Sequence, residues 1–170
     1  PDPQSPEAFG NDAAFILSYV RRTLWVTRKG LENPEAVPEW AAENGYELFP
    51  LYGYSHSGMS LSLGRGYPFN DLWDSGQAGV VLVKESADFG SSSPREVAES
   101  VVNEWNQYLS GDVWGYEVVT ADGDVIDSCW GCNGFDDCCD AARESASSLG
   151  AVRDAALQKD GALYQKLAVG

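Results

Sequence analysis

The chain is poor in positive charge and has no long hydrophobic run, and each shortage excludes a class of protein. Its 170 residues hold 11 Lys and Arg against 26 Asp and Glu, for a formal net charge of −15. This charge repels nucleic acid and anionic membranes, so we expect neither as a direct partner. No apolar run approaches the roughly 20 residues of a membrane-spanning helix. Residues 78–83 (AGVVLV) are among the longest.

The sequence also lacks the marks of a secreted, repetitive or disordered protein. Residues 1–6 (PDPQSP) have neither the basic start nor the apolar core of a signal peptide. There is no self-similarity at a period of roughly 20–50 residues. The hydrophobic share of 44%, with six Trp, eight Tyr and six Phe, is that of a globular protein. We therefore expect one cytoplasmic domain over residues 1–170, with an irregular arm over 1–12.

Cysteine occurs in one short segment only, at Cys129, Cys132, Cys138 and Cys139. A secreted disulfide scaffold would spread its cysteines to close long loops. Cys129-x-x-Cys132 has the spacing of half a zinc site. The adjacent pair after it cannot easily direct both sulfurs at one metal, and the sole histidine, His56, is distant in sequence. We expect no metal and no cofactor, and thiols that are free or joined in a redox-labile disulfide.

Hydrophobic periodicity predicts the elements of the first two thirds. Residues 13–26 favour a strand by their β-branched and aromatic content, although their length also suits a helix. Further strands are predicted over 46–54, 59–63 and 78–84, and Pro50 indicates an edge or a bulge. Residues 33–45 indicate a short acidic helix. A capping box of Ser93, Pro94 and Glu96 starts a second helix, which Gly111 ends.

The last third predicts a hairpin followed by helices. Residues 112–120 and 125–130 read as two strands, joined by a turn with Asp122-Gly123. Residues 136–149 and 151–167 read as helical. The whole predicts an α+β fold: a single domain with an antiparallel or mixed sheet of about five strands and helices packed on one face.

Four separated blocks resemble a family of small proteins carried by phages, prophages and plasmids. They are residues 51–58 (LYGYSHSG), 73–79 (WDSGQAG), 104–116 (EWNQYLSGDVWGY) and 127–131 (DSCWG). These blocks, residues 2–6 and Arg21-Arg22 follow the family's order, and the resemblance extends over nearly the whole chain. The resemblance implies accessory or anti-defence work on a mobile element, and no particular chemistry. Cys132 stands where the family usually has an aromatic residue. Cys138 and Cys139 lie outside the blocks, and residues 71–73 (DLW) replace a frequent Cys-Pro-Trp.

The blocks hold four residues of the types that an acyl-transfer site needs. Cys129 would be the nucleophile and His56 its base. Asp74 would orient the imidazole, and Gln77 would donate to the oxyanion. The order His, Asp, Gln, Cys matches no cysteine-protease signature. We therefore favour structural roles for these residues, in turns and on the inner face of the hairpin, with small-ligand or partner recognition as a third interpretation.

The negative charge is concentrated between residues 111 and 140. This stretch holds eight acids and no Lys or Arg: Asp112, Glu117, Asp122, Asp124, Asp127, Asp136, Asp137 and Asp140. Their spacing does not match a calcium-binding EF-hand loop. Spaced carboxylates on a rigid surface can imitate a phosphate backbone. Solubility, or a halophilic or high-GC source, explains the acidity equally well.

These patterns favour a non-enzymatic inhibitor of a host nucleic-acid-binding defence system, of the anti-CRISPR or anti-restriction type. It would act as a nucleic-acid mimic, and its partner would be a basic host protein or nucleic-acid-binding complex. The alternatives are a cysteine-dependent hydrolase or transferase using Cys129 and His56, and a structural or assembly module.

Overall fold

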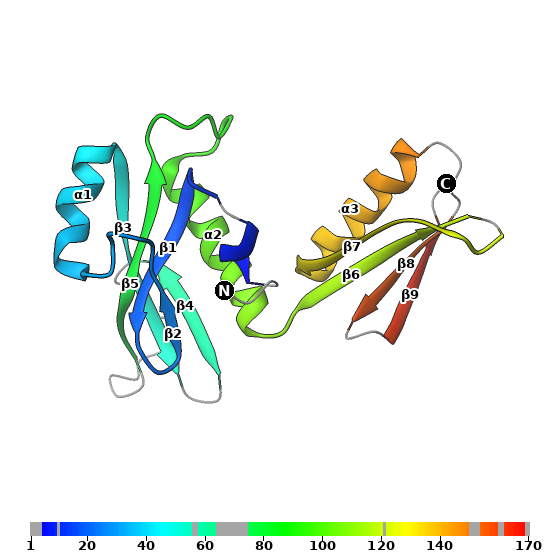
Figure 1. Cartoon of the computed structure of the whole chain (residues 1–170), viewed down its shortest axis with the longest axis horizontal. Coiled ribbons are helices and arrows are strands. Elements are labelled where there is room, and N and C mark those ends of the chain that lie inside the picture. Colours follow the sequence, from blue (N-terminus) through cyan, green and yellow to red (C-terminus); the bar gives the residue numbers. More distant parts are fainter. Residues whose placement is uncertain are drawn as a thin grey trace. The chain divides into compact units, whose positions relative to one another are not determined.

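The computed structural model describes residues 5–9, 11–55, 58–63, 75–120, 122–149, 154–159 and 162–168. The chain divides into two compact units. The N-terminal unit is residues 9–110, and the C-terminal unit is residues 111–170 with residues 1–8. Each contains an antiparallel sheet with helical packing (Figure 1). The predicted α+β class with an antiparallel five-stranded sheet is confirmed. Within the described residues, no helix is long and apolar enough to cross a membrane.

The sheet of the N-terminal unit has the strand order β2-β1-β5-β3-β4, with every neighbouring pair antiparallel. Its strands are β1 (Ala14–Val20), β2 (Leu24–Val26), β3 (Tyr46–Ser55), β4 (Met59–Leu63) and β5 (Ser75–Lys84). The predicted strand over 13–26 is two strands, because exposed Arg21 and Arg22 turn the chain between them. Pro50 pairs with β5, whereas the pairing with β4 begins at the next residue. It thus lies beside a single neighbouring strand and close to a bulge, as its missing N–H requires.

Helices cover both faces of this sheet. The α2 helix (Pro94–Leu109) packs on the face that carries Ile16 and Val81. The α1 helix (Val37–Asn44) packs on the face that carries Leu17 and Leu82. Successive residues of β1 and β5 are apolar and point to alternate faces, so both faces need cover. This differs from the expected packing on one face.

Local signals set the ends of these helices. The Ser93 hydroxyl accepts a hydrogen bond from the Glu96 N–H at 3.3 Å, and the Glu96 carboxylate accepts one from the Ser93 N–H at 2.7 Å. This is the predicted capping box. A 3-10 turn, η2 (Pro34–Ala36), leads into α1, and Gly45 ends that helix with φ 69.

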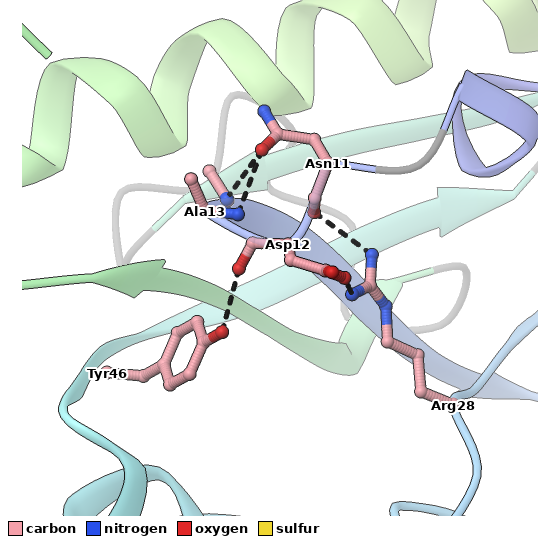
Figure 2. Close-up of polar contacts among 6 residues, drawn as sticks. Asn11, Asp12, Ala13, Arg28 and Tyr46 are labelled. Atoms are coloured by element: carbon pink, nitrogen blue, oxygen red, sulfur yellow. Dashed lines mark hydrogen bonds and ion pairs between the residues drawn. The ribbon is translucent and has the colours of Figure 1, made fainter. Parts of the chain in front are cut away.

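Arg28, in the loop that follows β2, binds the segment that precedes β1 (Figure 2). Its guanidinium forms an ion pair with Asp12 at 2.6 Å and donates to the Asn11 carbonyl at 3.0 Å. The same group lies over the Phe15 ring, 3.6 Å from its centroid. The Tyr46 hydroxyl donates to the Asp12 carbonyl at 2.7 Å, which joins β3 to this network.

The C-terminal unit has the strand order β7-β6-β8-β9. The strands are β6 (Val113–Val119), β7 (Val125–Asn133), β8 (Asp154–Lys159) and β9 (Ala162–Ala168). The predicted hairpin is confirmed as β6 and β7, with Gly123 in its turn at φ 93. The predicted helix over 136–149 is confirmed as α3 (Phe135–Ser148), which packs on the face carrying Tyr116 and Val118. In the part of the predicted arm that the structure describes (residues 5–9, 11 and 12), Pro6–Phe9 form a short 3-10 helix, η1.

The predicted helix over 151–167 is wrong, since β8 and β9 form there. The Ala, Leu, Gln and Lys content of this segment favours helix. Asp160-Gly161 stands between the strands in sequence and is a dipeptide that favours hairpins. β6 pairs with β7 on one side, and β8 forms hydrogen bonds with its other side, which would otherwise be left unpaired. This strand pairing overrides the segment's local preference for helix.

Candidate functional site

A bulge at Gly131 places two cysteines on one face of β7. In a regular strand, residues three apart point to opposite faces. Cys132 pairs with Trp114, whereas Trp130 pairs with the next residue of β6, so Gly131 is an extra residue in β7. Its φ of 85 is a conformation that favours glycine. The sulfurs of Cys129 and Cys132 are consequently 4.0 Å apart.

Trp130 lies on the opposite face of the hairpin and shows the effect of the bulge. Its ring covers Gly115 so closely that a Cβ added there would overlap the ring. The side chain is 47% exposed. The α3 face of β7 therefore presents the cysteines, and the other face presents this tryptophan.

A third thiol, Cys138 in α3, completes the cluster. It is fully buried and hydrogen-bonded to Cys132. The contact with Cys138 lowers the pKa of the Cys132 thiol to about 6, and the neighbouring Cys129 sulfur adds to the effect. The same bond holds the proton of Cys138 and raises its pKa, and burial adds to the rise. Of these two thiols, Cys132 is thus the one that loses its proton more readily.

Solvent reaches this thiol cluster (Cys129, Cys132 and Cys138) from the side of Cys129, which is exposed. Cys132 is half-buried. Partial burial raises the pKa of the Cys129 thiol, and the charge of Cys132 adds to the rise. The fourth cysteine, Cys139, also belongs to α3 and packs in the core of this unit, where burial raises its pKa. The cluster therefore combines an exposed thiol, Cys129, with a half-buried thiol of lower pKa, Cys132.

Further polar groups lie where β7 and α3 pack against each other, a contact that we call the seam. Asp127 accepts a hydrogen bond from the Ser145 hydroxyl, and Ser145 is also bonded to Tyr116. Burial raises the pKa of Tyr116, and the charges of Asp127 and the nearby thiols raise it further. The seam therefore has an acid at one end and the thiol cluster at the other. Within the described ranges, no group of three or more His, Cys, Asp or Glu is arranged to hold a metal ion.

The structure describes two of the four predicted acyl-transfer residues, Gln77 and Cys129. His56 and Asp74 lie outside the described residues. Gln77 is exposed on β5 of the N-terminal unit, whereas Cys129 belongs to the C-terminal unit. The acyl-transfer site therefore stays a prediction.

Gln77 lines a pocket of about 420 Å³ between the sheet and the start of α1. The other lining residues are mainly apolar and include Tyr19, Pro34, Val37, Leu48 and Val80. A small, largely apolar cavity with one amide has the size and character of a small-ligand site.

Some of the acids between residues 111 and 140 form side-chain hydrogen bonds or ion pairs, and others lie at exposed turns and ends of elements. Asp112 accepts a hydrogen bond from the Trp114 indole, and Asp140 forms an ion pair with Arg143 at 2.7 Å. The exposed acids Asp122 and Asp124 lie at the β6–β7 turn, and the exposed acids Asp136 and Asp137 lie in the first turn of α3. The two pairs flank opposite ends of β7. Eight steps of about 3.3 Å along that strand separate its ends by roughly 26 Å.

Sequence reasoning singled out Cys129 but missed the roles of Cys132 and Cys138. Gly131 directly follows the strand predicted over 125–130. Extending that strand through the glycine was the available signal, because an isolated glycine in a strand often marks a bulge. The partnership with α3 had no local signal. Comparisons of the chain with family models, curated proteins and solved structures gave no match.

Proposed function

We propose that the chain is a non-enzymatic protein of a mobile genetic element that inhibits a host nucleic-acid-binding defence system through an acidic surface. The surface consists of Asp122, Asp124, Asp136 and Asp137. It would act in the cytoplasm of an infected or plasmid-bearing cell. The resemblance of four sequence blocks to proteins of phages and plasmids supports the setting.

One observation carries this proposal: exposed carboxylates stand at both ends of β7, in a part of the chain with little compensating charge. Residues 111–149 contain nine acids and a single base, Arg143. That base is paired with Asp140, so it does not neutralise the acidic surface. A basic cleft shaped for a polyanion would be attracted to such a surface.

The two acidic pairs differ in their local surroundings. Asp136 and Asp137 lie at the N-terminus of α3, where the helix dipole favours negative charge. Asp122 stands in a tight turn, in which aspartate is a common residue. Local structure thus accounts for an aspartate at three of the four positions, Asp122, Asp136 and Asp137. Replacing the pairs separately, as well as together, shows how much each contributes to binding.

The test is a matched charge reversal. Lysine at Asp122, Asp124, Asp136 and Asp137 changes the net charge from −15 to −7, because each substitution adds two charges. The control places lysine at the exposed residues Glu35, Glu39, Glu43 and Glu47 of the N-terminal unit, with the same change in total charge.

The readout is the plating efficiency of a phage on cells that carry a restriction enzyme or a CRISPR effector. The unchanged chain and the control variant should protect the phage, and the reversed variant should not. Circular dichroism checks that both variants fold. Full protection by the reversed variant would contradict the proposal.

The hydrolase or transferase alternative stays a prediction, because His56 lies outside the described residues. The exposed thiol of Cys129, with the Cys132 sulfur 4.0 Å away, is the observation that favours thiol chemistry. If Cys129 were a catalytic nucleophile, Cys129→Ser would abolish the protective activity while leaving the fold intact.

A further inference from the structure

We propose that the thiol cluster is a redox site, at which Cys132 attacks a small-molecule disulfide and is then joined to Cys129 in an intramolecular disulfide. This role is independent of the acidic surface. It rests on the bulge at Gly131, on the sulfur separation of 4.0 Å and on the buried thiol behind Cys132.

The three cysteines have different positions that suit different parts of the reaction. Cys132 is half-buried and lies between the other two thiols. Cys129 is exposed and its sulfur is 4.0 Å from that of Cys132, so it is placed to attack a mixed disulfide formed on Cys132. Cys138 is 0% exposed and donates to Cys132, so it stabilises the attacking thiolate without meeting the substrate.

The reaction is a balanced thiol–disulfide exchange. The Cys132 thiolate attacks one sulfur of a disulfide RSSR, which forms a Cys132–SR bond and releases RS⁻. The Cys129 thiol loses its proton to solvent, and its sulfur attacks Cys132, which forms the Cys129–Cys132 bond and releases a second RS⁻. The two protein thiols are oxidised, and RSSR is reduced to two RSH.

Formation of the bond requires a local movement only. A disulfide has an S–S length of about 2.05 Å, so the two sulfurs must approach each other by about 2 Å. Both residues lie on β7, which is an edge strand of its sheet. A bond to Cys138 would instead require movement of a core residue of α3.

The test uses the reduced full chain and glutathione disulfide at pH 7. Cleavage before aspartate releases residues 127–135 (DSCWGCNGF), which contain Cys129 and Cys132 but neither of the other cysteines. We expect mass spectrometry to show this peptide lighter by two hydrogens. We expect two of the four thiols to remain free.

Single substitutions test the role proposed for each cysteine. Cys132→Ser should abolish the reaction, and Cys129→Ser should stop it at a glutathione adduct on Cys132. Cys138→Ala should move the pH midpoint of Cys132 alkylation from near 6 toward the ordinary value of about 8.5. Cys139→Ala is the matched control, since it removes another buried α3 thiol, and it should leave both reactions unchanged.

The proposal is overturned if glutathione disulfide leaves all four thiols free, or if the oxidised product joins a different pair. It is also overturned if Cys139→Ala moves the alkylation midpoint as far as Cys138→Ala does. In that case the shift would come from loosening of α3, and not from the bond to Cys132.

Discussion

Asn106 of α2 is hydrogen-bonded to both backbone groups of Leu61 on β4. The Leu61 N–H donates to Asn106 Oδ1 at 2.8 Å, and Asn106 Nδ2 donates to the Leu61 carbonyl at 2.9 Å. Because β4 is the outer strand of its sheet, an amide 45 residues away in sequence takes the place of a further strand. Asn106 lies in one of the four sequence blocks, and its role there is structural.

Substitution of Asn106 should therefore destabilise the N-terminal unit. Asn106→Ala leaves two partly buried backbone groups without this partner, so we expect a loss of about 2 kcal/mol in the free energy of unfolding. Urea denaturation measures it. Asn103→Ala, at an exposed position of the same helix, is the control and should change stability by less than about 0.5 kcal/mol. Equal effects of the two substitutions would contradict this role.

Gly79 allows β5 to approach β1. A Cβ at Gly79 would overlap the backbone carbonyl of Leu17, whereas one at Gly76 of the same strand would meet nothing within 4 Å. Backbone in the centre of a sheet cannot move aside, so Gly79→Ala should cost about 3 kcal/mol. Gly76→Ala should be tolerated. A comparison of thermal unfolding midpoints checks this, and similar midpoints would disprove the close approach.

The bulge at Gly131 has a consequence for both stability and thiol chemistry. Alanine at φ 85 should cost about 1–2 kcal/mol, because left-handed backbone is unfavourable for residues with a Cβ. Relaxation of the bulge should also separate the sulfurs and slow disulfide formation. Gly123→Ala introduces comparable strain at φ 93 in the hairpin turn and should leave the rate of thiol oxidation unchanged. Equal oxidation rates in the two variants would show that the bulge does not position the thiols.

Arg28 should contribute more to stability than its ion-pair partner. The Asp12 side chain is 92% exposed, so Asp12→Asn should cost less than about 1 kcal/mol. Arg28→Ala also removes the contact with the Phe15 ring and the bond to the Asn11 carbonyl, so we expect a loss of about 2 kcal/mol. Denaturant titration of both variants measures the difference. Equal losses would mean that the ion pair dominates.

The capping box predicts an acid-sensitive contribution from Glu96. Hydrogen bonds from Ser93 lower the pKa of this carboxyl below its ordinary value of 4.5. The folded chain then binds fewer protons than the unfolded chain, so the stabilisation is fully present above pH 4.5 and is lost as pH falls through the lowered pKa. The stability difference between the unchanged chain and Glu96→Gln should therefore shrink on acidification. A constant difference would contradict it, and Glu99→Gln is the control on the same helix.

The sequence by itself determined the elements whose causes are local. The capping box starts α2, Asp122-Gly123 turns the β6–β7 hairpin, and the apolar pattern of β5 marks a buried strand. Each signal depends on residues a few positions apart. Signals of the same short range predicted the α+β class and identified Cys129 as a candidate site residue.

Only the tertiary structure decided the rest, because those features depend on contacts between distant residues. The pairing of β8 with β6 made a sheet from a segment with helical composition. Burial on two faces placed α1 and α2 on opposite sides of one sheet. The thiol cluster needs the bulge at Gly131 and the packing of α3 against β7. Spacing within the sequence supplies neither, since a strand and a helix must first be brought together by their shared core.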